Sequence, residues 1–171
     1  MNRGEQIIRP RKGGTVKTIL VGYDGTRSAE YALTRAAEQA KAFDSKVIVV
    51  SVSSPDPVAT TGGAFGLMPY YYPATDMVAR TDEALWQQHR DRVQAFFADF
   101  GLAVEFAGVS GQPAEEIVEV AEEHNVDLII VGTREPGLLE RLFGGGSVSQ
   151  GVARRAHRDV LIVHPHEESE D

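Results

Sequence analysis

The sequence predicts a single doubly wound α/β domain with a mainly parallel sheet, and three observations lead to that fold class. Short, continuous apolar runs such as KVIVVSV recur along the chain and are typical of buried parallel strands. Segments with apolar residues at helical spacing separate these runs. The length of 171 residues suits one domain. Five strands alternating with four helices indicate a sheet with helices on both faces.

The first part of the chain carries two expected strands and a helix. Thr18–Gly22 is an apolar run that ends in glycine, as buried parallel strands do. Apolar residues at helical spacing predict a helix over 27–43, and Lys46–Val52 is the second strand. Residues 53 to about 80 hold four prolines and three glycines, which indicate a long loop. Loops of this length in a compact domain are usually functional or mobile.

The second part continues the alternation. A helix over 81–100 is expected to turn Leu85, Trp86, Val93, Phe96 and Phe97 inward, while His89, His124 and His157 are interpreted as surface or boundary residues. Pro113 is expected to start a helix, because its missing N–H costs nothing in the first turn. The remaining elements are strands at Ala103–Val109, Asp127–Gly132 and Val160–Val163, a glycine-rich loop at 132–147 and a helix at 147–157.

Composition narrows the classes of function. The chain has no cysteine, which excludes disulfide scaffolds, thiolate metal sites and cysteine nucleophiles. A net charge of −8 disfavours specific nucleic-acid binding and anionic membranes. No apolar run reaches the roughly 18 residues of a membrane span, and the first one is too short for a secretory signal. We therefore expect a cytoplasmic protein with a flexible basic arm at 1–16, a folded domain at 17–165 and an acidic tail at 166–171.

Ligands of doubly wound sheets bind at the carboxyl ends of the strands, where the strand order reverses. Asp24 follows the first strand, where it serves either as a cap for the next helix or as a ligand contact. The glycine fingerprint of dinucleotide-binding proteins and the Gly-Lys-Ser/Thr of phosphate loops are both missing. The aspartate and lysine positions of a phospho-receiver domain are missing as well.

A stronger signal follows the fourth strand. Ser147 and Gln150 form a capping box that places a helix start at Ser147. The glycines at 144–146 lead into that start, where free backbone N–H groups and the helix dipole favour an anion. The simpler alternative is a flexible surface loop before a well-capped helix. Position at the carboxyl end of a strand favours phosphate binding.

These residues resemble those of the universal stress protein family. The similarity covers about residues 17–164 and rests on ILVGYDGT (19–26), GQPAEEI (111–117), DLIIVGT (127–133) and RLF (141–143) followed by GSVS (146–149). The resemblance implies a flavodoxin-like sheet, a role in the stress response, a homodimer joined through strand five (about Val160 to Val163) and bound ATP. The nucleotide-binding residues that it implies are Asp24, Val52, Val131, Gly132, Arg134, Gly146, Ser147, Val148 and Ser149.

The sequence departs from the ATP-binding pattern of that family at two points. The second glycine of the pattern is replaced by Glu135, and the loop is one residue longer at Gly144-Gly145. A carboxylate about 4 Å from a phosphate is repelled by roughly 4 kcal/mol at an effective dielectric constant of 20. We expect Glu135 to weaken ATP binding unless Mg²⁺, Arg134 or a rerouted loop screens its charge; AMP or another adenine nucleotide is the alternative ligand.

Several features keep more than one interpretation. The aromatic segment Met68–Pro73 is expected to cover a ligand, to pack across a dimer or to fold onto its own subunit. Arg154, Arg155 and Arg158 either face phosphates or complement a helix C-terminus. An adenine-nucleotide-binding regulatory protein is the first functional hypothesis, and a dimeric interaction module that binds no nucleotide is the second. A slow ATP hydrolase is the third hypothesis, and it ranks last because no pair of catalytic nucleophile and base can be assigned from the sequence.

Overall fold

The computed structural model describes residues 15–54, 74–133 and 147–165, with the side chains of 74–81 excepted. Strands and helices alternate along the described residues, as the sequence predicts. In chain order the elements are β1 (Thr18–Gly22), α1 (Arg27–Phe43), β2 (Lys46–Ser53), α3 (Ala74–Asp99), β3 (Val104–Ser110), α4 (Pro113–Glu123), β4 (Leu128–Gly132), α6 (Val148–Arg155) and β5 (Asp159–Val163).

The five strands form one sheet in the order β3-β2-β1-β4-β5, and every pair of neighbours is parallel. The predicted class, a single doubly wound, flavodoxin-like five-stranded sheet with helices on both faces, is confirmed. Strand order runs in one direction from β1 to β3 and in the other from β1 through β4 to β5. The switch point therefore lies between the carboxyl ends of β1 and β4.

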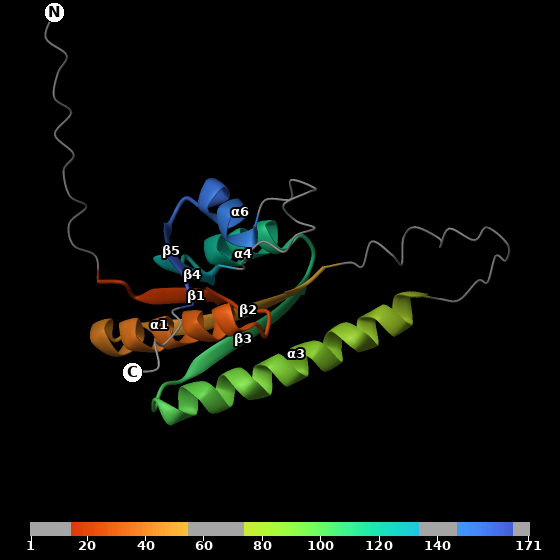
Figure 1. Cartoon of the computed structure of the whole chain (residues 1–171), viewed down its shortest axis with the longest axis horizontal. Coiled ribbons are helices and arrows are strands. Elements are labelled where there is room, and N and C mark those ends of the chain that lie inside the picture. The colour runs from red at the N-terminus through yellow and green to blue at the C-terminus, as the bar shows by residue number, and fades with distance from the viewer. Residues whose placement is uncertain (1–14, 55–73, 134–146, 166–171) are drawn as a thin grey trace, which may run out of the picture.

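Two apolar layers hold the helices on the sheet. The helices α1 and α3 cover one face, and α4 and α6 cover the other (Figure 1). The alternation of each strand supplies both layers, since successive side chains point to opposite faces. In β2, for example, Val47 and Val49 pack under α1 and α3, whereas Ile48 and Val50 pack under α4. All four side chains are at most 1% exposed.

Caps and strand ends follow the local chemistry of the sequence. Ser147 caps α6, with its Oγ accepting from the Gln150 N–H at 3.3 Å, as the capping box predicts. Pro113 occupies the first turn of α4. At the amino edge of the sheet, the Asp127 carboxylate accepts from the backbone N–H groups of Lys17 and Thr18 at 2.8 and 3.0 Å. This contact fixes the start of β1 beside β4.

At the opposite edge, the end of β5 is tied to the end of β4. The Thr133 N–H donates to the Val163 carbonyl at 2.8 Å, and its hydroxyl lies 3.2 Å from Nδ1 of His164. The carboxyl edge of the sheet is thus closed by short contacts between residues that directly follow the two strands.

The structure corrects three sequence predictions. The helix expected to begin near residue 81 begins at Ala74, because the last proline of the loop signal is Pro73 and nothing after it interrupts a helix. Leu85 is 37% exposed rather than turned inward. His89 is buried, and its environment is described below. Val93 and Phe97 are fully buried, as expected.

The other predicted boundaries agree with the structure within two residues. Val16, assigned to the basic arm, packs against the α1 side of the core. The rest of that arm and the acidic tail lie outside the described residues, apart from Thr15. Among the helices that the structure describes, none has the length and apolar character needed to cross a membrane.

Candidate nucleotide-binding site

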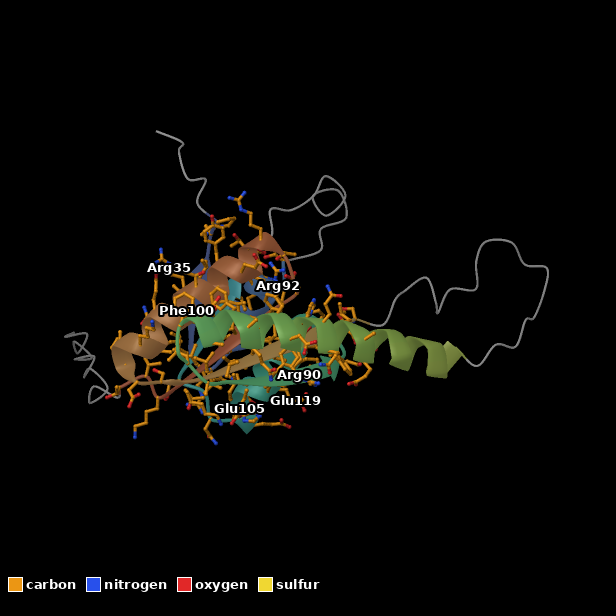
Figure 2. All side chains as sticks on the ribbon, turned by 90° about the horizontal axis from the view of Figure 1, so that it is seen from below. Arg35, Arg90, Arg92, Phe100, Glu105 and Glu119 are labelled. Carbon is orange, nitrogen blue, oxygen red and sulfur yellow. The ribbon has the colours of Figure 1, made fainter. Side chains whose placement is uncertain are left out.

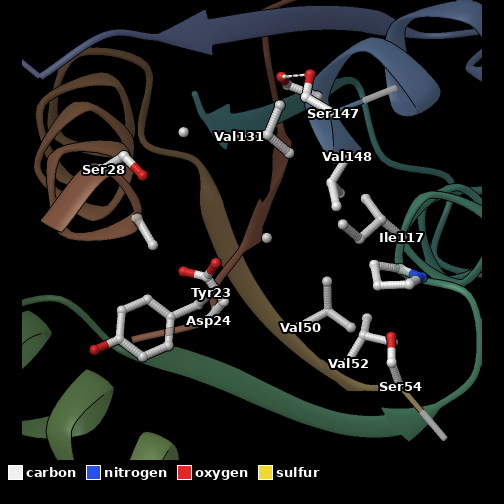
Figure 3. A pocket seen from close by; sticks show the side chains of 15 residues that line it. Tyr23, Asp24, Ser28, Val50, Val52, Ser54, Ile117, Val131, Ser147 and Val148 are labelled. Atoms are coloured by element: carbon white, nitrogen blue, oxygen red, sulfur yellow. Dashed lines mark hydrogen bonds between the residues drawn. The ribbon is translucent and has the colours of Figure 1, made fainter. Parts of the chain in front are cut away.

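A cavity of about 350 Å³ opens at the switch point, within the size range of small-molecule sites. Residues from the ends of β1, β2 and β4 and from the starts of α1, α4 and α6 surround it (Figure 3). Seven of the nine predicted site residues line this one cavity: Asp24, Val52, Val131, Gly132, Ser147, Val148 and Ser149. The other two, Arg134 and Gly146, lie outside the described residues.

Asp24 braces the turn after β1 but does not cap α1. Its Oδ1 accepts from the N–H of Thr26 at 3.0 Å and from the Thr26 hydroxyl at 2.6 Å. Thr26 is the actual cap, with its Oγ1 accepting from the Ala29 N–H at 3.3 Å. Asp24 is exposed, and its Oδ2 has no hydrogen bond within the described residues. One carboxylate oxygen therefore holds the turn and the other is available at the cavity.

Apolar side chains form the wall opposite Asp24. Val50 and Val52 of β2, Ile117 of α4 and Val131 of β4 face the same space, while Asp24 and Ser28 lie on the other side (Figure 3). Branched aliphatic walls exclude water and suit a flat apolar group such as a heterocyclic base. This wall extends the predicted set, since Val50 and Ile117 were not among the site residues expected from sequence.

The start of α6 supplies the polar end of the cavity. Ser147 and Ser149 line it, and their hydroxyl oxygens lie 3.0 Å apart (Figure 3). Ser149 is only 4% exposed, so the pair is held in place by packing as well as by its hydrogen bond. One of the two hydroxyl protons is used in this bond, and the other, together with the positive end of the helix dipole, favours an anionic group.

Gly132 lines the cavity, and the close packing of β4 against α1 requires a glycine there. A Cβ at this position would lie 2.5 Å from the carbonyl oxygen of Ser28 in the first turn of α1. The end of β4 therefore approaches the α1 backbone closely, as helix and strand do in dinucleotide-binding folds. Gly22 is less constrained, because a Cβ there would meet only side-chain atoms of Ile117 and Val131 at 3.1 and 3.2 Å.

A buried polar cluster that was not predicted from the sequence lies on the α3 side of the same edge. The Nδ1 of His89 lies 2.8 Å from the Ser51 hydroxyl oxygen, and these residues are 7% and 1% exposed. The ring of Tyr23 meets the His89 ring edge-on at 5.0 Å, pointing away from the cavity toward α3 (Figure 3). Nε2 of His89 lies 3.0 Å from where a Cβ on Gly25 would be. His89 thus supports the turn that carries Asp24.

Burial governs the protonation of this cluster. It lowers the pKa of His89 below its ordinary value, against the opposing effect of the Asp24 carboxylate. It raises the pKa of Tyr23, whose hydroxyl is buried. Arg92 of α3 (Figure 2) opposes that increase through its charge and a hydrogen bond to Tyr23, and it also pairs with Glu30 of α1. Both groups are therefore held neutral near pH 7.

Helical periodicity contains the signal that would have placed His89 in the core. His89, Val93 and Phe97 are four residues apart and form one face of α3. Ser51 lies on the same face of β2 as Val49. The Ser51–His89 pair has the residue types of a nucleophile and a base, yet neither residue lines the cavity. Its burial makes it a structural pair.

Metal-ligating side chains do not gather in the described part of the chain: no group of three or more His, Cys, Asp or Glu residues there is arranged to hold an ion. Asp24 is the single carboxylate among the residues described at the cavity. Glu135, the Gly144-Gly145 insertion and the Met68–Pro73 segment lie outside the described residues, and the predictions that concern them stay predictions.

The chain resembles proteins of one known family. The model of the universal stress protein family matches residues 15–164. The chain belongs to the universal stress protein family. It is 31% identical over 150 residues to the universal stress protein MJ0531 of Methanocaldococcus jannaschii, and the match covers 86% of this chain and 81% of that protein.

Solved structures confirm the fold. A universal stress protein in complex with cAMP is 30% identical, has a TM-score of 0.58 and matches over 88% of this chain and 98% of its own. The hypothetical protein MJ0577 is 25% identical, has a TM-score of 0.69 and matches over 91% of this chain and 100% of its own. The universal stress protein fold therefore extends over nearly the whole chain.

Proposed function

We propose that this protein binds an adenine nucleotide at the switch-point cavity, with ATP as the first candidate. We further propose that it acts as a regulatory protein of the stress response. The observation that carries the proposal is convergence: residues from three strand ends and three helix starts, distant in sequence, line one cavity. The cAMP complex of a relative 30% identical to this chain supports an adenine ligand.

The proposed arrangement follows the chemistry of the walls. The base lies between Val52 and the turn at Asp24, whose Oδ2 accepts a hydrogen bond from the amino group of adenine or from the ribose. Val131 and Gly132 contact the nucleoside. The first phosphate lies at Ser147, Val148 and Ser149, where hydroxyl groups and backbone N–H groups of the α6 start donate to it. Any Mg²⁺ arrives with the nucleotide, since the described residues provide one carboxylate.

A matched pair of substitutions tests the site. Val52 of β2 and Val109 of β3 are register partners on the same face of the sheet, both are half-buried, and only Val52 lines the cavity. Val52→Trp is expected to fill the base pocket and abolish ATP binding in isothermal titration calorimetry. Val109→Trp is expected to bind like the wild type. Wild-type protein that takes up no ATP, ADP, AMP or cAMP at millimolar concentration would refute the proposal and favour the interaction-module hypothesis.

Nucleotide retained from the cell provides an independent check. The purified protein is denatured, and the released small molecules are separated by chromatography and identified by absorbance. Adenine nucleotide in near-stoichiometric amount supports the proposal. Guanine nucleotide in its place would contradict the assignment of the base pocket.

We propose in addition that two copies join through β5. Within the described residues β5 pairs with β4 on one side alone, and Val160, Leu161 and Ile162 are only half-buried. An apolar edge strand left open invites pairing. Light scattering is expected to give a dimer at micromolar concentration, and single cysteines introduced at residues 160–163 are expected to cross-link. A monomeric mass would refute the dimer, and a dimer without cross-links would place its interface elsewhere.

A further inference from the structure

A second cavity, of about 330 Å³, adjoins the first. It lies between the first turn of α4 and one side of α6, and it shares Pro113, Ser147 and Val148 with the switch-point cavity. These three residues form the boundary between the two spaces. A ligand whose anionic end lies at Ser147 can therefore extend into the second cavity.

The two cavities differ in charge. Among the described residues that line the first, Asp24 is charged and no lysine, arginine or histidine is present. The second is lined by Arg154 and Arg155 against one carboxylate, Glu115. A polyphosphate chain bears several negative charges, and the first cavity supplies no described cation to balance them. The second cavity supplies an excess of one positive charge.

The two arginines are not equivalent. Nη2 of Arg155 lies 3.2 Å from Oε1 of Glu115, so these two charges neutralise each other. Arg154 is exposed and has no hydrogen bond or ion pair within the described residues. Side chains on a helix lean toward its N-terminus, so Arg154 extends back along the row of Gly151, Gln150 and Ser147. About 10 Å of helix separates Arg154 from Ser147.

The start of α4 adds to this environment. Gln112 precedes α4 without a side-chain hydrogen bond to its first turn, and its carbonyl accepts from the N–H groups of Glu115 and Glu116. Among the described residues the Ala114 N–H is left without a partner at the positive end of the helix, beside the second cavity. Gly151 allows the two helices to meet, since a Cβ there would lie 2.7 Å from Cβ of Ala114. The second cavity is thus built from a close helix crossing, Arg154, the Arg155–Glu115 ion pair and the first turn of α4.

We propose that the second cavity is the subsite for the distal phosphates of a nucleoside di- or triphosphate, and that Arg154 selects these ligands over monophosphates. The inference rests on the proposed function, because the base and the first phosphate occupy the switch-point cavity. A guanidinium group suits phosphate oxygens, to which it donates two parallel hydrogen bonds.

Calorimetric titrations of AMP, ADP and ATP test the subsite in three proteins. The wild type is expected to bind ATP at least tenfold more tightly than AMP. Arg154→Gln is expected to weaken ATP binding about tenfold and to leave AMP binding within twofold. The matched control is Arg158→Gln, which removes the same charge four residues further on, outside the residues that line either cavity. It is expected to leave the ratio of ATP to AMP affinity unchanged.

A substitution that removes a negative charge from the second cavity, instead of a positive one, makes the test more specific. Glu115→Gln removes the repelling carboxylate and releases Arg155, so ATP affinity is expected to rise severalfold while AMP affinity stays constant. Circular dichroism and thermal unfolding verify that each variant is folded.

The outcomes separate the two proposals. Equal AMP and ATP affinities in the wild type, or the same ATP loss in Arg154→Gln and Arg158→Gln, overturn the subsite and leave the nucleotide site intact. Failure of the wild type to bind every adenine nucleotide overturns the proposed function itself.

Discussion

At the carboxyl end of β2, neighbouring residues serve opposite faces of the sheet. Val50 and Val52 line the open cavity beneath α4 and α6, whereas Ser51 is buried under α3 against His89. The face proposed to bind a ligand is thus mainly apolar at this strand, and the closed face is polar. Polar residues at strand ends therefore do not by themselves mark a binding face. Their role depends on which face of the sheet they point to and on whether a neighbouring residue already forms a hydrogen bond with them.

Gly132→Ala is expected to have the largest effect, because it disturbs both faces together. The new Cβ would lie 2.5 Å from the Ser28 carbonyl oxygen, so the first turn of α1 must move. We expect the free energy of unfolding to fall by about 3 kcal/mol, with loss of nucleotide binding. Denaturant titration and calorimetry measure the two effects.

The control for that substitution is Gly101→Ala. Gly101 has φ +69°, but no atom lies within 4 Å of its added Cβ. Its cost is limited to the left-handed backbone, about 1 kcal/mol. A larger loss at Gly101 than at Gly132 would mean that backbone strain, and not close packing at β4, dominates.

Adjacent substitutions in β2 test the comparison directly. Ser51→Ala leaves the buried Nδ1 of His89 without its partner and is expected to cost about 1–2 kcal/mol of unfolding free energy. Val52→Ala is expected to cost less than about 1 kcal/mol, and to weaken ATP binding about fivefold. The reverse pattern, with stability lost at Val52 and affinity lost at Ser51, would exchange the roles of the two faces.

The buried His89 predicts a pH dependence of stability. Its pKa is lower in the folded protein than the ordinary value of about 6.5. As the pH falls below that value, the unfolded chain takes up a proton that the folded protein resists, so the free energy of unfolding decreases. Above about pH 7 the group is neutral in both states and contributes no slope. Urea titrations between pH 7.5 and 5 measure the effect.

Two variants isolate the contribution of His89. His89→Gln keeps a hydrogen-bonding group near Ser51 but does not titrate, so the decrease at low pH is expected to become smaller. His124→Gln, which removes a histidine at an exposed position, is the control variant. Identical profiles for the wild type and His89→Gln would contradict the assignment.

The smallest effect is expected at the amino edge, away from both faces of the site. Nζ of Lys46 lies 2.8 Å from Oε2 of Glu105, and each side chain is about half exposed. Glu105→Gln is expected to change the free energy of unfolding by less than about 0.5 kcal/mol, without effect on nucleotide affinity. A larger change in affinity would indicate coupling across the length of the sheet.

The sequence was sufficient for the fold because its strands are continuous apolar runs between clear helices, caps and glycines. The resemblance to the universal stress protein family implied seven residues that the structure brings into one cavity. Their convergence follows from the fold, because the carboxyl ends of β1, β2 and β4 meet at the switch point. The early start of α3 was missed because the signal of the loop ends only at Pro73. The residue type of a lone histidine does not reveal burial, whereas the spacing of His89 from Val93 and Phe97 places it on the buried face of α3.

Because the sheet is parallel, residues 17 and 164 lie at opposite edges of it, and a dye attached at one position has different surroundings from a dye attached at the other. Asp127 holds Lys17 at the amino edge, whereas His164 lies beside Thr133, the residue that directly follows Gly132 of the cavity. The chain has no cysteine, so one cysteine introduced at either position takes up a fluorescent dye selectively. A dye at 164 is expected to change its emission when the cavity fills, and a dye at 17 is its silent reference. The protein can thus be turned into an optical sensor of its own ligand.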